Sequence, residues 1–476
     1  MELRAGSRCR PAALVVLLAL ASGGAGSAFP VSPAEVAPTP LTVSGGTRSI
    51  SLAEALTLAD GQSLEVRRAG VQTQAARGEE REAVLGWVPS LSASAGISAT
   101  DGQVQGSFGD FRDVDFRSAA PYGFLRLALN PAETWFSSAT ASRRAESVAD
   151  QERAVRRLVL IRVAELYYDL VRQSENRRIA RLGVEDSGDL FRIADVLLRQ
   201  GTGRGDDAER ARAQLATAEQ RLLDAERRVF VASVNLATAL DLDPTIVLDP
   251  TPEGAQEQTL VAGEPDEKSI LKRALESRPE VAAARRLLEA VRSQRSADVA
   301  RLAAPTVEAF YRQGATGETY ADLSGLRSYG IAASWNISAR GFARVRTTAT
   351  REEEARLAVA QAEQAVRADV LGAWSEVLVG GSRLEKAREA RQAAESTLRI
   401  SQVRYRNGTS PAIETLLAEQ QLDQARLSEV AAVVDYNVAQ VRLRTQLPPV
   451  APGDLSAPPG SGVHKADGKD RIREGK

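Results

Sequence analysis

The feature that most constrains this chain is an internal duplication. Three short motifs occur twice, in the same order and at a nearly constant offset: Val88-Pro89-Ser90-Leu91 with Ala304-Pro305-Thr306-Val307, Leu127-Ala128-Leu129-Asn130 with Ala333-Ser334-Trp335-Asn336, and Arg199-Gln200-Gly201-Thr202 with Arg406-Asn407-Gly408-Thr409. Each half is therefore predicted to run helix, two strands, long helix, turn and helix. We place the first repeat at residues 49–261 and the second at residues 262–447.

Each half contains one very long helical pattern. Apolar residues recur at helical spacing across residues 139–200 and again across residues 341–405, and no Pro interrupts either run. At 1.5 Å of rise per residue, each helix would reach roughly 90–100 Å. Ordinary globular helices have only three or four turns, so these patterns predict a coiled coil or a helical barrel.

The segments before the long helices have the period of a β-strand. Apolar and small polar residues alternate from Leu91 to Ala99 and from Tyr329 to Ile337, and residues 122–130 and 306–313 are their predicted partner strands. Each strand has roughly 9–11 residues, the length that crosses a bilayer when tilted. The Gly- and Asp-rich stretches between the strands of each pair, 101–120 and 314–326, are predicted to be loops.

Four strands limit how such a sheet could exist in a membrane. Only helices and closed barrels span lipid, because every backbone polar group must be paired, and the smallest known barrels need about eight strands. Membrane strands would therefore require several chains to share one barrel. The alternative is a soluble four-stranded sheet beside a helical bundle. Aromatic residues on or beside the strands fit either an interfacial girdle or core packing: Tyr122, Tyr311, Tyr329 and Trp335.

The two ends of the chain have other compositions. Arg4, Arg8 and Arg10 precede a short apolar run and then small residues, which predicts a secretory signal peptide at residues 1–28, with an uncleaved anchor as the alternative. Residues 29–48 are predicted to be a flexible leader. Residues 448–476, rich in Pro and Gly and then charged, are predicted to be a disordered tail.

Composition excludes several classes of function. The net charge of −1 gives no reason to expect a nucleic-acid partner. The sequence has one Cys, Cys9 in the predicted signal peptide, and one His, His464 in the predicted tail. Neither a Ser/His nor a Cys/His catalytic arrangement can be built from them, so we expect no enzyme activity, no cofactor and no metal site.

The whole pattern resembles the TolC-like outer-membrane efflux protein family over residues 49–447. The resemblance rests on the order of three motifs: Ser51-Leu52-Ala53-Glu54-Ala55-Leu56 opens the first half, Arg278-Pro279-Glu280-Val281 opens the second, and Tyr405-Arg406-Asn407-Gly408-Thr409-Ser410 precedes the last helix. It implies an α+β membrane fold in which a homotrimer forms a twelve-stranded β-barrel in outer-membrane lipid, four strands per chain, continued by a long periplasmic α-helical barrel.

The resemblance also implies a function and partners. Such a chain is the outer-membrane channel of a tripartite efflux or type I secretion system, working with a periplasmic adaptor (membrane fusion) protein and an inner-membrane pump. A periplasmic coiled-coil adaptor or scaffold protein is the alternative. An adaptor would need one hairpin and a lipoyl-like or barrel-shaped β-domain rather than a duplicated strand pair.

The helical turns are the candidate gate. Asp206 and Asp207 follow the first turn and Glu414 follows the second, all in the predicted first turn of the next helix. Acids at that position are favoured by the helix dipole, so capping is one interpretation and an acidic constriction is the other.

The resemblance bears on the same turns. It implies that Asp207 and Glu414 match acids at the closed tip and that Tyr405 matches a gate tyrosine, while the family's gate Arg falls on Ser410 and a second acid falls on Leu417. The turn residues Gly201, Thr202, Gly408 and Thr409 would also contact the adaptor, although Gly at such a turn is equally expected to end a helix.

Overall fold

The computed structural model describes residues 45–105, 107–201, 204–260 and 267–446. All of them belong to one unit, Val43–Lys476. The predicted signal peptide with Cys9, the predicted tail with His464, and Thr202 lie outside the described residues. The division of the chain at residues 261 and 262 stays a prediction.

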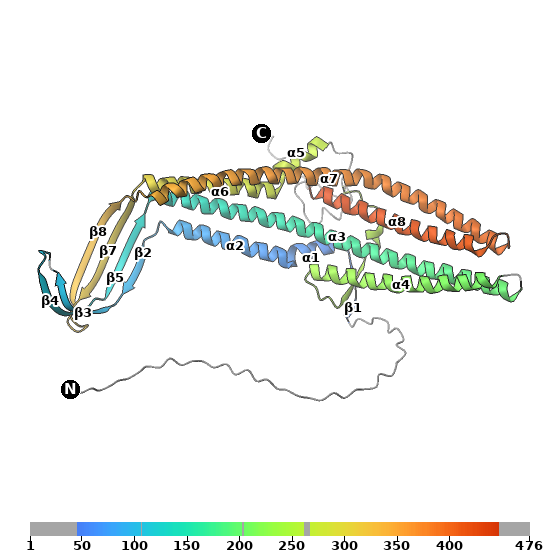
Figure 1. Ribbon diagram of the computed structural model, residues 1–476, viewed down its shortest axis with the longest axis horizontal. Helices are drawn as coiled ribbons and strands as arrows, with labels where there is room; N and C mark the ends of the chain where they lie inside the picture. Colours follow the sequence, from blue (N-terminus) through green and yellow to red (C-terminus); the bar gives the residue numbers. More distant parts are fainter. Residues whose placement is uncertain (1–44, 106, 202–203, 261–266, 447–476) are drawn as a thin grey trace, which may run out of the picture. The chain divides into compact units, whose positions relative to one another are not determined.

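Helices account for most of the described chain (Figure 1). They are α1 (Leu52–Gln62), α2 (Leu64–Leu85), α3 (Pro131–Arg199), α4 (Gly205–Ala239), the short 3-10 helix η1 (Pro252–Ala255), α5 (Glu267–Ser277), α6 (Pro279–Ala303), α7 (Ala339–Arg406) and α8 (Ala412–Arg444). The duplication is visible in α3 and α7, with 69 and 68 residues, each followed by a tight turn and a helix of about half its length. Among the described helices, none combines the length and the apolar character needed to cross a bilayer.

The strands of the described residues form three sheets. They are β1 (Gly45–Ile50), β2 (Ser90–Ser94), β3 (Ile97–Gln105), β4 (Phe111–Ala119), β5 (Tyr122–Leu129), β6 (Ile246–Pro250), β7 (Thr306–Thr316) and β8 (Ser324–Ser334). The main sheet has the order β2-β5-β7-β8, all antiparallel, so each repeat contributes two neighbouring strands. The pairs β1-β6, which is parallel, and β3-β4 form the other two sheets.

The register of the main sheet separates two faces. Leu125, Tyr311 and Tyr329 are successive cross-strand neighbours on an exposed apolar face, which we call the outer face. The other face, which we call the inner face, has a row made of Ser92, Phe124, Arg312 and Ser328, one residue from each strand. Tyr122 lies on this inner face, two residues from Phe124, whereas Tyr311 and Tyr329 lie on the outer face.

Local sequence signals explain why the long helices begin where they do. Asn130 Oδ1 accepts the Glu133 N–H at 3.0 Å and Pro131 occupies the first turn of α3, while Ser338 Oγ accepts the Gly341 N–H at 3.3 Å at the start of α7. Asn130 Nδ2 also donates to Ala304 O at 2.7 Å, where α6 ends. The duplicated motif aligns Asn336 with Asn130, but the cap of α7 is Ser338, two residues later.

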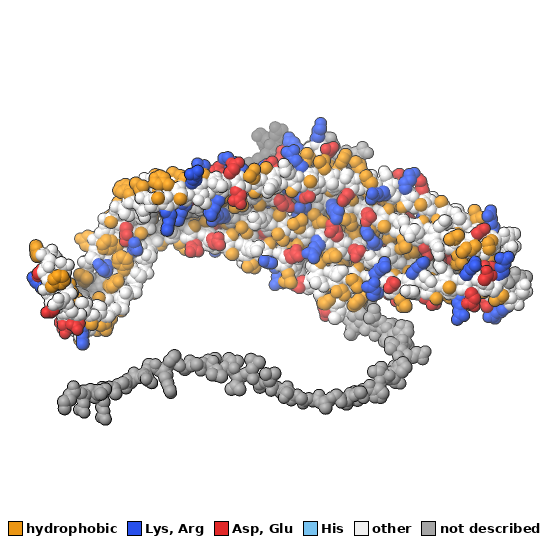
Figure 2. Space-filling view, viewed as in Figure 1, with side chains coloured by type: hydrophobic (Ala, Val, Ile, Leu, Met, Phe, Trp, Pro, Cys, Tyr) orange, Lys and Arg blue, Asp and Glu red, His pale blue; other side chains and the backbone are white. Residues whose placement is uncertain are grey.

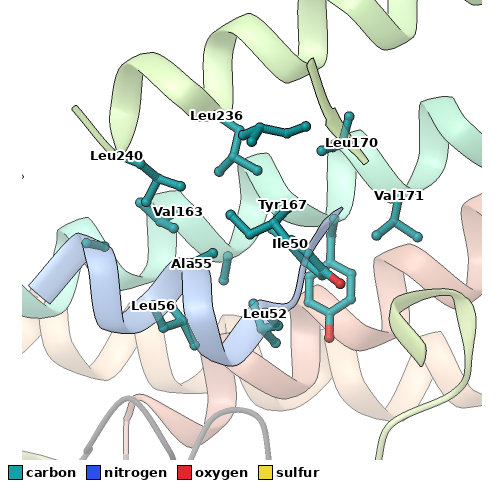
Figure 3. Close-up of a cluster of buried hydrophobic side chains, with 14 of the residues drawn as sticks. Ile50, Leu52, Ala55, Leu56, Val163, Tyr167, Leu170, Val171, Leu236 and Leu240 are labelled. Atoms are coloured by element: carbon teal, nitrogen blue, oxygen red, sulfur yellow. The ribbon is translucent and has the colours of Figure 1, made fainter. Parts of the chain in front are cut away.

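The largest core joins the N-terminal segment to the middle of the helices (Figure 3). Ile50 at the end of β1 and Leu56 in α1 are fully buried against Tyr168 of α3 and Leu236 of α4. The Tyr167 and Tyr168 rings meet edge to face with centroids 5.5 Å apart. This packing gives the Ser51–Leu56 motif its physical role, because the capped helix α1 presents its apolar side to two other helices.

Several segments differ from their sequence-based expectation. Residues 91–99, predicted to be one strand, are divided between the end of β2 and the start of β3, which belong to different sheets. Residues 101–120, predicted to be a loop, form most of the β3-β4 hairpin, whose register runs from Ile97 paired with Ala119 to Gln105 paired with Phe111. The Gly and Asp residues there break the apolar alternation on which the strand prediction relied. Strand β1 begins at Gly45 and so occupies the last positions of the predicted leader, 29–48.

Arg278, the first residue of the Arg-Pro-Glu-Val motif, is a buried structural cation with 3% exposure. Its guanidinium donates to Gln446 Oε1 at 2.5 Å and to Asp369 Oδ2 at 3.0 Å, and it lies 3.2 Å from Glu280 Oε2. Burial lowers the pKa of Arg278 relative to its usual value. The motif therefore ties the start of α6 to α7 and to the residues after α8.

Replacing Arg278 should destabilise this junction. Arg278→Met removes the shared hydrogen-bond donor of three elements, and we expect a loss of about 3 kcal/mol in the free energy of unfolding. Thermal unfolding followed by circular dichroism measures it. Arg273→Met, the same change at an exposed position of α5, is the control. Equal melting temperatures for the two variants would contradict the structural role of Arg278.

Candidate functional site

The first helical turn ends α3 through a left-handed glycine. Gly201 has φ +73° and its N–H donates to Leu198 O at 3.0 Å. Residues with a Cβ rarely adopt this conformation, so Gly is required by the backbone itself. Arg204 then stands before the first residue of α4, without a side-chain capping hydrogen bond.

The second turn has the same left-handed glycine and one further backbone hydrogen bond. Gly408 has φ +68°, its N–H donates to Tyr405 O at 2.9 Å, and the Thr409 N–H donates to Arg404 O at 2.9 Å. These two hydrogen bonds make up a Schellman motif. Thr409 Oγ1 also donates to Arg404 O at 3.0 Å. The helix-ending role proposed for these Gly residues is thus supported at both turns.

The three acidic candidates occupy the first turns of α4 and α8 as expected, but in different surroundings. Asp206 is exposed and lies 3.5 Å from Arg210 Nη2. Glu414 is exposed and accepts a hydrogen bond from Ser410 Oγ at 2.5 Å. Asp207 is only 9% exposed. The N-cap residues Arg204 and Pro411 make no side-chain cap bond, and the acids lie in the first turns, where the helix dipole favours negative charge.

The two turns pack against each other through one apolar cluster. Its buried members come from four helices: Leu190 and Ala194 of α3, Ala208 and Ala211 of α4, Tyr405 of α7, and Ala412 and Leu416 of α8. Burial, followed by the charge of the nearby Asp207, raises the pKa of Tyr405. The structure thus brings Asp207 and Tyr405 together and leaves Asp206, Glu414 and Leu417 exposed.

A buried acidic cluster lies beside this site, and sequence reasoning missed it. Glu419 of α8 is 4% exposed and neither of its carboxylate oxygens has a hydrogen-bond partner within the described residues. Burial, then the charges of Asp186 on α3 and Asp423 on α8, raise the pKa of Glu419 to about 7. Its sequence signal is position, because Glu419 follows Ala412 and Leu416 along the buried face of α8.

The arginines near Glu419 act on its acidic neighbours rather than on Glu419 itself. Arg426 Nη1 lies 3.5 Å from Asp186 Oδ2 and 3.8 Å from Asp423 Oδ1, and Arg221 of α4 acts on Asp423. On the α7 side the contacts are apolar, through Leu398 packed with Ala418 and Leu422. Within the described residues, no group of three or more His, Cys, Asp or Glu side chains is arranged to hold a metal ion.

Glu419 makes the stability of this region pH-dependent. Its pKa is raised on folding, so the folded state binds the proton more tightly, and stability falls as pH rises from about 4.5 toward about 7 and stays low above it. Glu419→Gln should therefore raise the free energy of unfolding by about 1–2 kcal/mol at pH 8 and change it little at pH 4.5.

Thermal unfolding at the two pH values measures this effect. Glu226→Gln on the exposed side of α4 is the matched control and should show no pH-dependent gain. If the Glu419→Gln variant and the parent protein have the same melting temperature at both pH values, ionised Glu419 does not destabilise the folded state.

Comparison with known proteins decides the family. The profile of the outer membrane efflux protein family matches residues 55–241 and 270–447, one match per repeat and more than half of the chain. The chain belongs to the outer membrane efflux protein family. A comparison with curated protein sequences gave no match.

Solved structures share the fold of this efflux protein. A membrane protein from Pseudomonas aeruginosa aligns with a TM-score of 0.75 at 18% identity, over 83% of this chain and 93% of that one. The CmeC outer membrane channel of Campylobacter jejuni aligns with a TM-score of 0.72 at 14% identity, over 83% of this chain and 85% of that one. The open-state MtrE outer membrane channel of Neisseria gonorrhoeae aligns with a TM-score of 0.67 at 18% identity, over 83% of this chain and 88% of that one. The predicted fold class, outer-membrane location and efflux-channel function are confirmed. The channel interpretation therefore holds in place of the alternative, a periplasmic adaptor or scaffold protein.

Proposed function

We propose that three copies of this efflux protein close one barrel and form a passive conduit for efflux. The observation that carries this proposal is the order β2-β5-β7-β8, which leaves β2 and β8 as open edges. In lipid each edge needs a partner for its backbone N–H and C=O groups, and the apolar outer face suits lipid contact. Pairing β2 of one chain with β8 of the next satisfies both edges in a closed ring.

The helices would carry the conduit across the periplasm to its partners. Helix α3 begins directly after β5 and has 69 residues, so its turn lies about 100 Å from its first residue if the helix is straight. We propose that the turn residues Gly201, Gly408 and Thr409, with Thr202 next in sequence to Gly201, contact a periplasmic adaptor protein, which would link the channel to an inner-membrane pump. This contact is supported by the exposure of Gly201, Gly408 and Thr409.

The same turns would form the gate. Three chains would bring the exposed Glu414 and Asp206 and the buried Asp207 to one narrow mouth, where like charges attract multivalent cations. Ser410 stands where the family's gate Arg is expected, and it donates to Glu414 of its own chain instead of forming an ion pair. We therefore expect apolar packing around Tyr405, rather than an Arg link, to hold the closed state.

The acids can be tested by single-channel recording in planar bilayers. If they line the mouth, trivalent cations added on the periplasmic side block the current, and Asp207→Asn combined with Glu414→Gln abolishes the block. The exposed residue Glu414 should account for most of this effect. If the acids only favour helix formation, the double variant loses about 0.5–1 kcal/mol of stability per site and keeps the block.

Glu209→Gln, an exposed change in the same turn of α4, is the control for total charge. Unchanged block in the double variant would remove these residues from the gate. A parent protein that forms no pores in the bilayer would instead contradict the conduit itself.

A further inference from the structure

The inner face of the main sheet carries aromatic and charged side chains close together. The Phe310 ring lies across Gly330, where an added Cβ would meet Phe310 Cε1 at 2.9 Å, and its centroid is 6.1 Å from that of Phe124. Tyr122 lies two residues from Phe124 on the same strand. Because the outer face is apolar, this inner face is the one directed into the lumen of a closed barrel.

Two arginines on this face are in different electrostatic states. Arg126 Nε lies 2.8 Å from Glu308 Oε1, so its charge is neutralised by a neighbouring strand. Arg312 Nε donates to Ser328 Oγ at 3.1 Å, and its guanidinium carbon lies 5.6 Å from the Tyr122 ring centroid. No ion pair joins Arg312 to a carboxylate of the described residues.

The register explains why no carboxylate neutralises the charge of Arg312. Its row consists of Ser92, Phe124, Arg312 and Ser328, and none of these residues is acidic. Glu308, the acid on the same face of β7, is four residues away, which is about 13 Å along a strand. Because β7 lies between β5 and β8, both lateral neighbours of Arg312 come from its own chain, whatever the assembly adds at the edges.

We propose that Arg312, with Tyr122, Phe124 and Phe310, forms a binding site for aromatic carboxylates in the barrel lumen. This proposal rests on the trimeric conduit, whose symmetry would place three guanidinium groups at one level. A guanidinium binds a carboxylate through two parallel hydrogen bonds, and the phenyl rings beside it offer stacking surfaces for the aromatic part. Rings of Arg or Lys line anion pores, where binding must be weak enough for release.

Single-channel recording with 2-naphthoate as the probe tests the site. In potassium chloride, 2-naphthoate should reduce the current of the parent channel, and Arg312→Gln should raise the half-blocking concentration about tenfold. Arg312→Gln should also shift the reversal potential in a salt gradient toward potassium selectivity. Arg312→Lys keeps the charge and loses the planar fork, so its block should be intermediate.

Arg327→Gln is the matched control. Arg327 lies on β8 next to Ser328 but on the outer face, paired in register with Gln313, so the variant changes the same charge outside the lumen. Equal block of the parent and Arg312→Gln channels would overturn the site. Equal block by acetate and 2-naphthoate would overturn its aromatic part. Absence of any pore from the parent protein would refute the conduit, an outcome distinct from failure of the site.

Discussion

The remainder of this structure depends on the two open edges of the β2-β5-β7-β8 sheet, because both edge strands need hydrogen-bond partners. Every backbone polar group within lipid needs a partner, and a chain with four such strands cannot supply partners for its own edge strands. In the proposed conduit, assembly is therefore part of the fold. The same constraint explains the duplication, because each repeat supplies one strand pair and one long helical hairpin, and symmetric repetition of such units closes a ring.

The sequence predicted the periodic parts of this fold well and the irregular parts poorly. Helices α3 and α7 were predictable because their apolar spacing continues for many turns without Pro. The β3-β4 hairpin was not, because backbone pairing needs no apolar alternation, and Asp101 and Asp115 face each other there. Glu419 escaped notice because an acid in a helical pattern is usually exposed, and only the packing of α8 against α3 makes it buried. The helix-ending role of the turn glycines was predictable from the conformational freedom of Gly, whereas adaptor contact came from the family resemblance and stays a prediction.

Charge is distributed unevenly between the helices and the two functional regions. Along the helices, positive and negative side chains are interspersed (Figure 2), and many form ion pairs such as Arg442 with Glu165 and Glu376. Exposed pairs of this kind contribute little stability each, but they leave few free charges. The turns hold both signs, with exposed Arg404 and Arg406 at the end of α7 and exposed Glu414 at the start of α8, whereas Arg312 on the inner face of the sheet has no acid in its row.

The contact between β2 of one chain and β8 of the next is the most direct measure of this account. The only Cys, Cys9, lies in the predicted signal peptide, so introduced cysteines would stand alone in the mature protein. Ser92→Cys is combined in turn with Leu326→Cys, Ser328→Cys and Ala332→Cys, all on the inner face, and with Tyr329→Cys on the outer face as the control. Within one chain these strands are about 14 Å apart, too far for a disulfide. After mild oxidation in outer membranes, at least one inner-face pair should give covalent trimers on denaturing gels, and monomers alone from every pair would contradict the shared barrel.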